Sequence, residues 1–370
     1  MSVIKVGNTW AFRTDVGKHP VTGKRRQVYK GNFRTKKIAE LAQAEFITTV
    51  KNQGYFTPAN ELMEIFVNKW LYTVYKHHVK PTTFERAEQV VKSHILPAFG
   101  KCEVSSIKTY DVQQFLSSKS GDGLSPATVK IIRNILSKAF QTAIDWDLIN
   151  KNPTERVKGP SIEKKSKETW SAEESKIFLA GCDELRWKVA FSLALHTGMR
   201  RGEVLALKWD NVDFEKQTVK IKESLAYTKE HGLIFTIPKT SNSFREVVIP
   251  ASLIELLREL NNEQNIMKQR MGTSYHSYNL VVSTTDGKPV QPRNFARTFE
   301  RLIKKASVKK ISLHGLRHTN ATLLMKQGIN PKIVSERLGH ANVGITLDIY
   351  SHTDLDMQIE TVNKLEKMLV

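Results

Sequence analysis

HTGMRRGE (residues 196–203) is the first of four short stretches that decide how this chain can fold and act. The other three, far apart along the sequence, are PKTSNSFR (238–245), HGLRH (314–318) and LGHANVGITLDIY (338–350). Together they contain arginines, a lysine, histidines and a tyrosine. Attack on a phosphodiester builds negative charge on its non-bridging oxygens, which fixed cations stabilise. The set therefore indicates a tyrosine hydroxyl that attacks a phosphodiester, and no carboxylate cluster suited to a metal ion accompanies it.

The spacing within two of these stretches predicts which side chains meet. Arg200 and Glu203 are three residues apart, so on a helix they share a face and can form an ion pair. An ordinary surface salt bridge is the alternative. His314 and Arg317 have the same spacing and would point from one helical turn toward one spot, whereas His318 points elsewhere and is predicted to be structural.

The other two stretches predict a hairpin and a helix end. Lys239 follows a strand-like run, and the chain is expected to return as a strand over Arg245–Ile249, which places Lys239 on the hairpin. His340 comes directly after Leu338–Gly339, where a helix is predicted to end. Tyr350 follows ten residues later, and a tyrosine of the core is the alternative interpretation.

These stretches resemble the active-site motifs of tyrosine recombinases of the integrase type, which occur in bacteriophages and conjugative elements. The resemblance spans essentially the whole chain and is most specific over residues 196–350. It implies that two arginines, Arg200 and Arg317, and one histidine, His340, contact the scissile phosphate. It further implies that Glu203 supports Arg200.

The resemblance also implies the proton transfers and the nucleophile. Lys239 would protonate the leaving 5′ oxygen, and His314 would accept a proton or a hydrogen bond. Tyr350 would attack the phosphate and form a covalent 3′-phosphotyrosine, which releases a 5′ hydroxyl. Because that link keeps the phosphodiester energy, a 5′ hydroxyl from another duplex can reverse it. Strand exchange is therefore expected to need no ATP, no metal and no cofactor.

The composition predicts a polyanionic partner. Lys and Arg number 57 against 37 Asp and Glu, a net charge of +20, and clustered cations gain affinity by releasing counterions from phosphate. A merely soluble basic protein is the alternative. Residues 1–58 alone carry eleven Lys and Arg against three Asp and Glu. Double-stranded DNA is therefore the expected partner, at core-type and arm-type sites.

Other features of the sequence point to the cytoplasm. Cys102 and Cys182 lie far apart without metal-ligand spacing, so neither a disulfide framework nor a zinc site is predicted. The N-terminus lacks an apolar signal core, and no run approaches the roughly 18 apolar residues that span a membrane. We expect a cytoplasmic protein, associated with the nucleoid of a bacterial host and not with a membrane.

The chain is predicted to be multidomain and mainly α-helical, because its 370 residues exceed one ordinary domain. Residues 1–55 indicate short strands, a basic hairpin tip and a helix that follows Thr35 as N-cap. This layout resembles the arm-site DNA-binding domain of integrases, a small sheet with one helix. A solvated charged face is the alternative for any one basic residue there. The residues expected to contact DNA are Arg13, Lys24, Arg25, Arg26 and Lys30.

Residues 58–155 indicate an all-helical segment that resembles the core-binding domain of integrases. Helices are predicted to begin at Pro58 after the N-cap Thr57, to run from about Thr83 to Ile95 and end before Pro97, and to cover Lys108–Ser118 and Ser125–Trp146. The residues expected to contact the DNA backbone are Thr82, Thr83, Lys92, Lys130 and Arg133.

Residues 151–169 contain two prolines and few apolar residues and indicate an exposed linker, with 156–169 taken as the boundary between domains. The catalytic domain, 170–370, is predicted to be mainly helical with a small antiparallel sheet within residues 212–249. Its end, Leu355–Val370, is amphipathic. The resemblance implies that this end docks on a neighbouring subunit. Packing within the same subunit is the alternative.

The expected protein is therefore an integrase, a site-specific recombinase that inserts a mobile element and excises it with the help of a small directionality factor. It would act as a homotetramer on DNA. A type IB topoisomerase shares the chemistry, but the basic N-terminal segment and the amphipathic tail favour the integrase. A DNA-binding regulator that never cleaves is the other alternative, and the full catalytic set argues against it.

Overall fold

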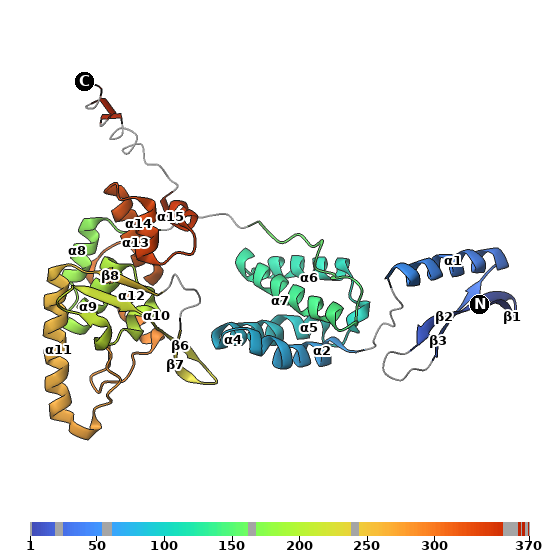
Figure 1. Ribbon diagram of the computed structural model, residues 1–370, viewed down its shortest axis with the longest axis horizontal. Helices are drawn as coiled ribbons and strands as arrows, with labels where there is room; N and C mark the ends of the chain where they lie inside the picture. The colour runs from blue at the N-terminus through green and yellow to red at the C-terminus, as the bar shows by residue number, and fades with distance from the viewer. Residues whose placement is uncertain are drawn as a thin grey trace. The chain divides into compact units, whose positions relative to one another are not determined.

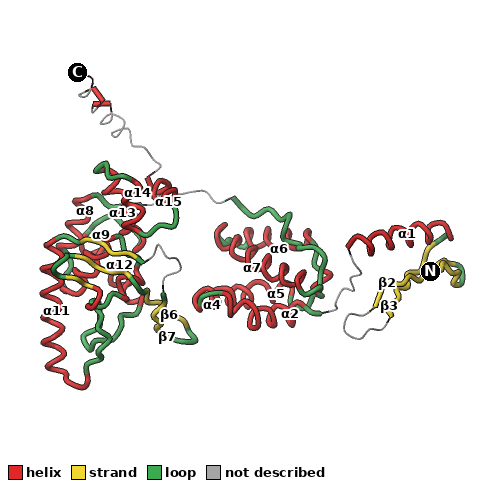
Figure 2. Tube along the Cα trace, in the orientation of Figure 1, coloured by secondary structure: helices red, strands yellow, loops and turns green. Residues whose placement is uncertain are grey.

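The structure of the chain is a computed structural model that divides into two units, Met1–Glu163 and Lys164–Val370 (Figure 1). It describes residues 2–18, 25–53, 61–161, 168–237 and 244–350, and in the tail residues 362–363, 365–366 and 369. Helices predominate over strands in both units (Figure 2). The prediction of a mainly helical fold with small antiparallel sheets is confirmed. Within the described part, no helix is long and apolar enough to cross a membrane.

The first unit begins with a small sheet and one helix. The strands β1 (Ser2–Val6), β2 (Thr9–Lys18) and β3 (Arg25–Phe33) form an antiparallel sheet in that order, and α1 (Lys36–Gln53) follows. Thr35 accepts a hydrogen bond from the backbone N–H of Ile38 at 3.3 Å, so the predicted N-cap is confirmed. The predicted strands are also confirmed, while residues 19–24 of the hairpin tip lie outside the described residues.

One face of this sheet packs against α1. Phe12 is fully buried and stacks on Phe33, with its ring centroid 5.9 Å from that of Phe46 on α1. Two apolar residues of α1, Ile38 and Leu41, do not face the sheet, because they are 47% and 64% exposed. The other face of the sheet is left uncovered by α1.

The rest of the first unit is helical. Its elements are α2 (Met63–Trp70), a π-helical turn (Leu71–Tyr75), α3 (Lys76–His78), α4 (Pro81–Val90), a second π-helical turn (Val91–Ile95), α5 (Leu96–Phe99), α6 (Thr109–Gly121) and α7 (Pro126–Asp145). Ser125 is the N-cap of α7, since its hydroxyl accepts from the backbone N–H of Thr128 at 3.2 Å, and the predicted start of this helix is confirmed. A buried apolar core joins these helices, with Phe66, Trp70 and Phe140 among its largest side chains.

Two helix boundaries in this unit differ from the prediction. The first helix begins at Met63, after an extended Leu62, and not at Pro58, which lies outside the described residues. The second begins at Pro81 and does not end before Pro97. In the π-helical turn the N–H of Leu96 bonds to the carbonyl of Val91, five residues back. The hydrogen-bond register therefore shifts just where Pro97 has no N–H to donate, and the helix tolerates the proline.

The segment after α7 is not wholly a linker. Asn152 donates from Nδ2 to the carbonyl of Ser137 at 3.0 Å, and Val157 is 4% exposed in the core of the unit. The prediction that residues 151–169 form an exposed linker is therefore wrong for the first part of that stretch. Short polar segments can pack when side chains satisfy their backbone groups, which composition alone does not reveal.

The second unit is mainly helical around a small sheet. Its helices are α8 (Ala172–Ala180), α9 (Leu185–Thr197), α10 (Arg201–Ala206), α11 (Ala251–Met271), α12 (Pro292–Ala306), α13 (Leu313–Lys326), α14 (Pro331–Leu338) and α15 (Val343–Tyr350). Its strands are β4 (Val212–Asp213), β5 (Thr218–Ile221), β6 (Ser224–Thr228), β7 (Gly232–Thr236) and β8 (Arg245–Val248).

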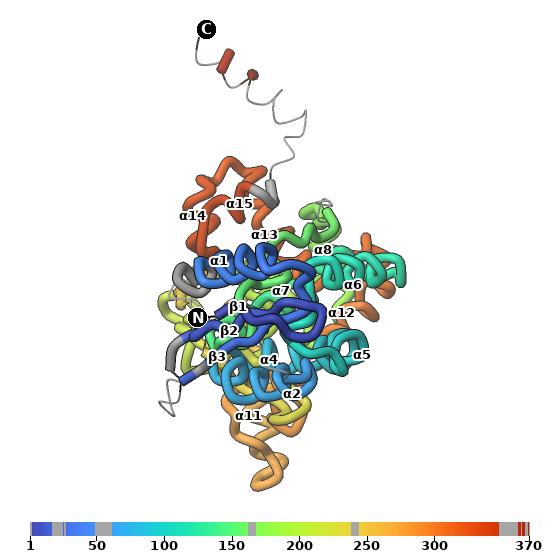
Figure 3. The backbone as a smooth tube through the Cα atoms, turned by 90° about the vertical axis from the view of Figure 1, so that its right-hand side faces the viewer, coloured from blue at the N-terminus to red at the C-terminus, as the bar shows by residue number. Residues whose placement is uncertain are grey.

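The strands of this unit fall within the range predicted for the antiparallel sheet. β4, β5 and β8 form one sheet in that order, and β6 pairs with β7 as a separate hairpin. The core is aromatic, with Phe178, Phe191 and Phe299 in mutual ring contact. The helices α13, α14 and α15 lie together at one end of the unit in both views (Figures 1 and 3). The four stretches with candidate catalytic residues belong to this unit.

Candidate active site

Arg200 is placed by a turn that only glycine fits. α9 ends at Thr197, and Gly198 follows in the left-handed region with φ of +65°. A Cβ on Gly198 would lie 2.1 Å from Cδ2 of Leu338 on α14. Any other residue would strain this left-handed backbone and would require the side chain of Leu338 to move. The turn leads into α10, with Arg200 in the extended N-cap position.

Arg200 and Glu203 form an ion pair, as their spacing predicted, with the carboxylate buried and the guanidinium partly exposed. Arg200 Nη1 donates to Glu203 Oε1 at 2.7 Å, and the backbone N–H of Arg200 donates to Oε2 at 3.0 Å. The carboxylate is only 3% exposed, so the alternative of an exposed surface salt bridge is wrong. Burial by itself raises the pKa of Glu203, but hydrogen bonds and the charges of its arginine partners outweigh burial and hold that pKa below its ordinary value.

Arg245 is part of this cluster, although the sequence did not predict it. Its Nη2 donates to Glu203 Oε2 at 2.9 Å, and its Nε donates to the backbone carbonyl of Arg337 at 2.8 Å. The side chain is 6% exposed. Arg245 belongs to one of the four stretches, where its position indicates only the start of a strand. The signal that could have found it is a charged residue where β8 enters the core.

Arg317 is the most buried cation of the cluster. It is 1% exposed, and its Nη1 donates to the carbonyl of Gly198 at 2.7 Å. Its Nη2 is buried and has no hydrogen-bond partner among the residues that the structure describes. Burial, and then the charges of Arg200 and Arg245, lower the pKa of Arg317 to about 9. A buried N–H without an acceptor is costly, which indicates a site made for an anion.

His314 and His318 lie one turn apart on α13, beside Arg317. The two rings meet edge to face, with centroids 4.6 Å apart. His314 is exposed and His318 is 4% exposed. The structure thus separates them as predicted: His314 is accessible, while His318 is packed inside.

His340 follows the left-handed Gly339 that ends α14, as predicted. Its Nδ1 lies 2.8 Å from the hydroxyl of Thr346, a fully buried residue on α15. Burial, and then the charges of Arg317 and Arg200, lower the pKa of His340 to about 4. The free protein therefore keeps this imidazole neutral at pH 7.

For two of the predicted catalytic residues the structure gives only the surroundings. Tyr350 is the last residue of α15, which packs against α13 and α14, and its side chain lies outside the description. Lys239 lies outside the described residues altogether. The backbone on both sides of its segment is described: β7 ends at Thr236 and β8 begins at Arg245, so the prediction of two flanking strands is confirmed. The prediction that these two strands form a hairpin is wrong, because β7 pairs with β6 and β8 pairs with β5 in a different sheet.

The site as a whole holds an excess of fixed positive charge. In addition to burial, the charge of Arg200 helps to lower the pKa of Arg245, and the charges of Arg200 and Arg245 help to lower that of Arg317, while the carboxylate of Glu203 opposes both shifts. The described residues contain no group of His, Cys, Asp and Glu that could hold a metal ion. The three clustered guanidinium groups are suited to binding an anion such as a phosphate group.

The predicted DNA contacts of the N-terminal sheet fall on two faces. Arg13 is exposed opposite Tyr29, on the face that α1 leaves open. Arg25 is 68% exposed and forms an ion pair with Asp15. Lys30 pairs in register with the buried Phe12, so it lies on the helix side, where its ammonium sits 4.5 Å from the ring centroid of Phe46. Lys24 lies outside the described residues, and so does the side chain of Arg26.

The predicted contacts of the helical segment also differ in availability. Thr82 and Thr83 lie in the first turn of α4, and Lys130 is exposed on α7. Lys92 donates to Glu88 at 2.8 Å. Arg133 donates from Nε to the carbonyl of Val157 and from Nη2 to that of Thr154, both at 3.1 Å. Arg133 therefore fixes the segment after α7, a structural role that the sequence did not predict.

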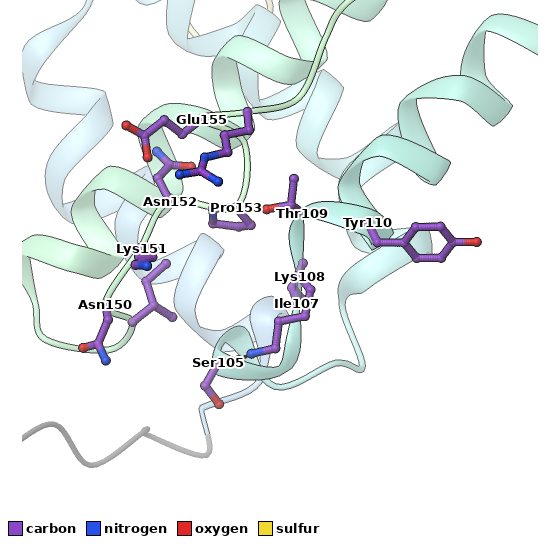
Figure 4. Close-up of a pocket in the computed structure, with 12 residues that line it drawn as sticks. Ser105, Ile107, Lys108, Thr109, Tyr110, Asn150, Lys151, Asn152, Pro153 and Glu155 are labelled. Atoms are coloured by element: carbon purple, nitrogen blue, oxygen red, sulfur yellow. Dashed lines mark hydrogen bonds between the residues drawn. The ribbon is translucent and has the colours of Figure 1, made fainter. Parts of the chain in front are cut away.

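A separate cavity of about 700 Å³ lies in the helical segment (Figure 4). Ile107, Ile149 and Pro153 are its apolar lining residues, and Lys108 and Arg156 are among the charged ones. None of the predicted DNA contacts is among the residues that line it. We assign it no role in catalysis.

Comparison with protein families matches three models to successive parts of the chain. The Phage integrase family model matches residues 168–356, which include all four motif stretches. The model of the phage integrase N-terminal SAM-like domain matches residues 63–120, and the Arm DNA-binding domain model matches residues 3–50.

Relatives match over the full length. The chain is 32% identical to "Tyrosine recombinase XerC-like" of Caldanaerobacter subterraneus subsp. tengcongensis, with 91% of each chain covered. It is 29% identical to the ICEBs1 integrase of Bacillus subtilis, with 100% of each chain covered. Among solved structures, the fold is similar to the Tn1549 transposon integrase in complex with transposon right end DNA, with a TM-score of 0.69, 22% identity, and 83% of this chain and 100% of that chain covered. It is also similar to a lambda integrase tetramer bound to a Holliday junction, with a TM-score of 0.59, 19% identity, and 94% and 93% covered.

Proposed function

Since this chain belongs to the phage integrase family and is a site-specific tyrosine recombinase, we propose that Arg200, Arg317 and His340 bind the scissile phosphate of its DNA and that Tyr350 attacks it. One observation carries the assignment: Arg317 is buried beside two other guanidinium groups, with Nη2 unpaired among the described residues. A non-bridging phosphate oxygen supplies the acceptor and the negative charge that this site lacks. Arg200, which is 40% exposed, reaches the same phosphate from the side open to solvent.

The cations are fixed before the substrate arrives. Glu203 holds the Arg200 guanidinium, and the carbonyl of Gly198 holds that of Arg317. When the tyrosine oxygen attacks, negative charge grows on the non-bridging oxygens, and cations that need not reorient stabilise it more than water does. This is how the arrangement lowers the barrier to cleavage.

His340 contributes a neutral hydrogen bond. With its pKa lowered to about 4, the ring carries one proton at pH 7. Nδ1 lies 2.8 Å from the hydroxyl of Thr346. We assign Thr346 as the donor of this hydrogen bond, which places the proton of the ring on Nε2. Nε2–H then donates to a phosphate oxygen. His314, exposed one turn before Arg317, is assigned to accept a proton or a hydrogen bond at the same phosphate.

The covalent step exchanges one phosphate ester for another. The Tyr350 oxygen gives up its proton, for which His314 is the assigned acceptor, and forms a bond to phosphorus, while the bond from phosphorus to the 5′ oxygen breaks. Lys239 gives a proton to that 5′ oxygen, which leaves as a hydroxyl. The product is a 3′-phosphotyrosine, and attack by a 5′ hydroxyl of a second duplex reverses the step and joins the new strands.

The remaining parts of the chain are assigned to DNA binding and assembly. We assign residues 1–55 to arm-type sites and 58–155 to core-type sites, with 156–169 as the connection to the catalytic domain, 170–370. The lambda integrase relative was solved as a tetramer on a Holliday junction. We infer that this chain likewise acts as a homotetramer, with its C-terminal tail on a neighbouring subunit. A small directionality factor is expected to govern excision.

A plasmid assay tests the proposed nucleophile without knowledge of the target site. Supercoiled plasmid is incubated with the protein in EDTA, and protein–DNA adducts that survive SDS are measured beside the Tyr350→Phe variant. We expect adducts and relaxed plasmid with the wild-type chain and neither with the variant. Equal adducts from both proteins would show that another residue is the nucleophile.

A second assay separates recombination from topoisomerase activity. Genomic DNA fragments that carry the wild-type adduct are sequenced to map the core site, and two copies of that site are placed on one plasmid. We expect the segment between them to be deleted or inverted. Relaxation without exchange would favour the type IB-like topoisomerase instead.

A further inference from the structure

We propose that Arg245 is a positioning residue for the cleavage reaction, acting through Glu203 to keep the charge of Arg200 available to the scissile phosphate. This inference rests on the proposed function of Arg200. Arg245 does not face an open site: its side chain is 6% exposed, and it donates hydrogen bonds to the carboxylate of Glu203 and to the backbone of Arg337.

Glu203 is shared between two arginines in an ordered way. Its Oε1 receives Nη1 of Arg200, and its Oε2 receives both Nη2 of Arg245 and the backbone N–H of Arg200. The carboxylate is buried, so its charge is screened little by solvent. Without Arg245, that charge would be opposed mainly by Arg200. Arg245 therefore lets Arg200 be oriented by Glu203 without being neutralised by it.

Arg245 also fixes the end of α14, which leads to His340. Its Nε donates to the backbone carbonyl of Arg337 in the last turn of α14. Arg337 reaches back, and its Nη2 donates to the carbonyl of Val248 at the end of β8. Two arginines thus join β8 and α14 by reciprocal hydrogen bonds. Next to this junction, Nη2 of Arg200 contacts the carbonyl of Gly339 at 3.3 Å.

These contacts need the fork of a guanidinium. Arg245 uses Nη2 for the carboxylate and Nε for the carbonyl, two donors that point in different directions from one planar group. A lysine in its place keeps the positive charge but presents a single ammonium on a flexible stem. Arg245→Lys therefore keeps a positive charge in the core but no longer holds it on Oε2 of Glu203 while bonding the carbonyl of Arg337, so more of the carboxylate charge is left to Arg200.

The first test is a double-mutant cycle with Glu203→Gln. We expect Arg245→Lys to slow single-turnover cleavage by about 10-fold to 100-fold, the range usual for residues that orient a reacting group. In the Glu203→Gln background the same change should cost less than about 3-fold, because the carboxylate through which Arg245 acts is gone. Equal losses in the two backgrounds would overturn the proposal. Arg270→Lys, on the exposed last turn of α11, is the matched control.

The second test uses chemically altered DNA of the mapped core site. A methylphosphonate at the scissile position removes the negative charge that Arg200 must neutralise, and a 5′-bridging phosphorothiolate removes the need to protonate the leaving group. On the methylphosphonate, we expect the fold loss in cleavage rate caused by Arg245→Lys to be at least about 5-fold smaller, because the charge that Arg200 opposes is then absent. The deficit should stay unchanged on the phosphorothiolate.

The outcomes distinguish the possible routes. A deficit that shrinks only on the phosphorothiolate would mean that Arg245 acts on leaving-group protonation, and the proposal would be wrong. A deficit equal on all three substrates would mean a general structural role, which would also contradict the proposal. Failure of the wild-type chain to cleave, or equal cleavage by Tyr350→Phe, would instead sink the proposed function. If Arg245→Lys does not fold, the double variant Arg245→Gln, Glu203→Gln removes both charges and is compared with Glu203→Gln alone.

Discussion

The cations of the two units are used in opposite ways. In the catalytic unit, Arg317 and Arg245 are almost fully buried and are held by backbone carbonyls or by Glu203. In the first unit, the side chains of Arg25 and Lys92 are 68% and 59% exposed. The residue types are similar, but the surroundings differ.

Because of this difference in burial, we expect the buried and the exposed cations to have different roles. A buried guanidinium cannot reorient or be screened, so it is ready to stabilise charge that appears only in the transition state. An exposed cation is screened by salt, and it contributes by releasing counterions when DNA binds. We therefore expect the buried cluster to set the rate of cleavage and the exposed cations to set affinity and its salt dependence.

The largest effect should follow removal of the unpaired buried cation. Arg317→Met should slow cleavage of the core site by about 10²-fold to 10³-fold, as when one preorganised donor is lost, with little change in DNA affinity. Its unfolding temperature should change little, because removing a buried donor without an acceptor among the described residues and relieving repulsion from Arg200 and Arg245 offset the loss of the hydrogen bond to the carbonyl of Gly198. Single-turnover cleavage and thermal unfolding check this. If the variant cleaved at the wild-type rate, the role assigned to the buried cations would be contradicted.

The next effect concerns the exposed cations. Residues 1–55 hold eleven Lys and Arg. Deleting them should flatten the dependence of DNA affinity on salt. For each phosphate that these cations no longer neutralise, the slope of log K against log salt should fall by about 0.9. Cleavage of a pre-nicked core site should be spared. An unchanged slope would contradict the assignment of this domain to DNA.

The parts of the site that depend on short spacing could be predicted from the sequence. Arg200 with Glu203, and His314 with Arg317, are one helical turn apart, so a helix is enough to bring each pair together. Gly339 predicted the helix end that delivers His340. Contacts between distant segments could not be predicted in this way. Arg245 meets Glu203 and Arg337 only because β8 and α14 pack together.

The same reason explains what the sequence did not show in the first unit. A lone arginine on a helix looks the same in a sequence whether it faces DNA or a carbonyl of its own chain, so the bonds from Arg133 to two backbone carbonyls could not be predicted. Pro97 normally ends a helix, but the π-helical turn before it shifts the hydrogen bonds, and no local signal announces that shift. The strands, N-caps and glycine turns were predictable, because each depends on neighbouring residues.

Arg133 tests this difference between the two units further. It is a cation of the first unit, but it donates to backbone carbonyls as the buried arginines of the catalytic unit do. Arg133→Gln should lower the free energy of unfolding by about 1–3 kcal/mol, since two carbonyls of the segment after α7 lose their donors. Lys130→Gln, an exposed neighbour on the same helix, should change it by less than about 0.5 kcal/mol. Urea unfolding followed by tryptophan fluorescence measures both. If the two variants were equally stable and only Arg133→Gln lost DNA affinity, Arg133 would be a DNA contact after all.

The smallest effect should be a pH dependence that comes from His340. Its pKa is about 4 in the folded chain and about 6.5 in an unfolded one. Between these pH values the unfolded chain binds a proton at His340 and the folded chain does not. The free energy of unfolding therefore falls as pH drops from 6.5 toward 4, by at most about 1.4 kcal/mol per pH unit. His340→Gln should flatten this fall, while the exposed His77→Gln should not. Sulfate should flatten it too, because an anion beside Arg317 and Arg200 offsets the charges that, together with burial, lower the pKa of His340. A slope that sulfate leaves unchanged would mean that the anion binds elsewhere and that the buried cluster is not the phosphate site.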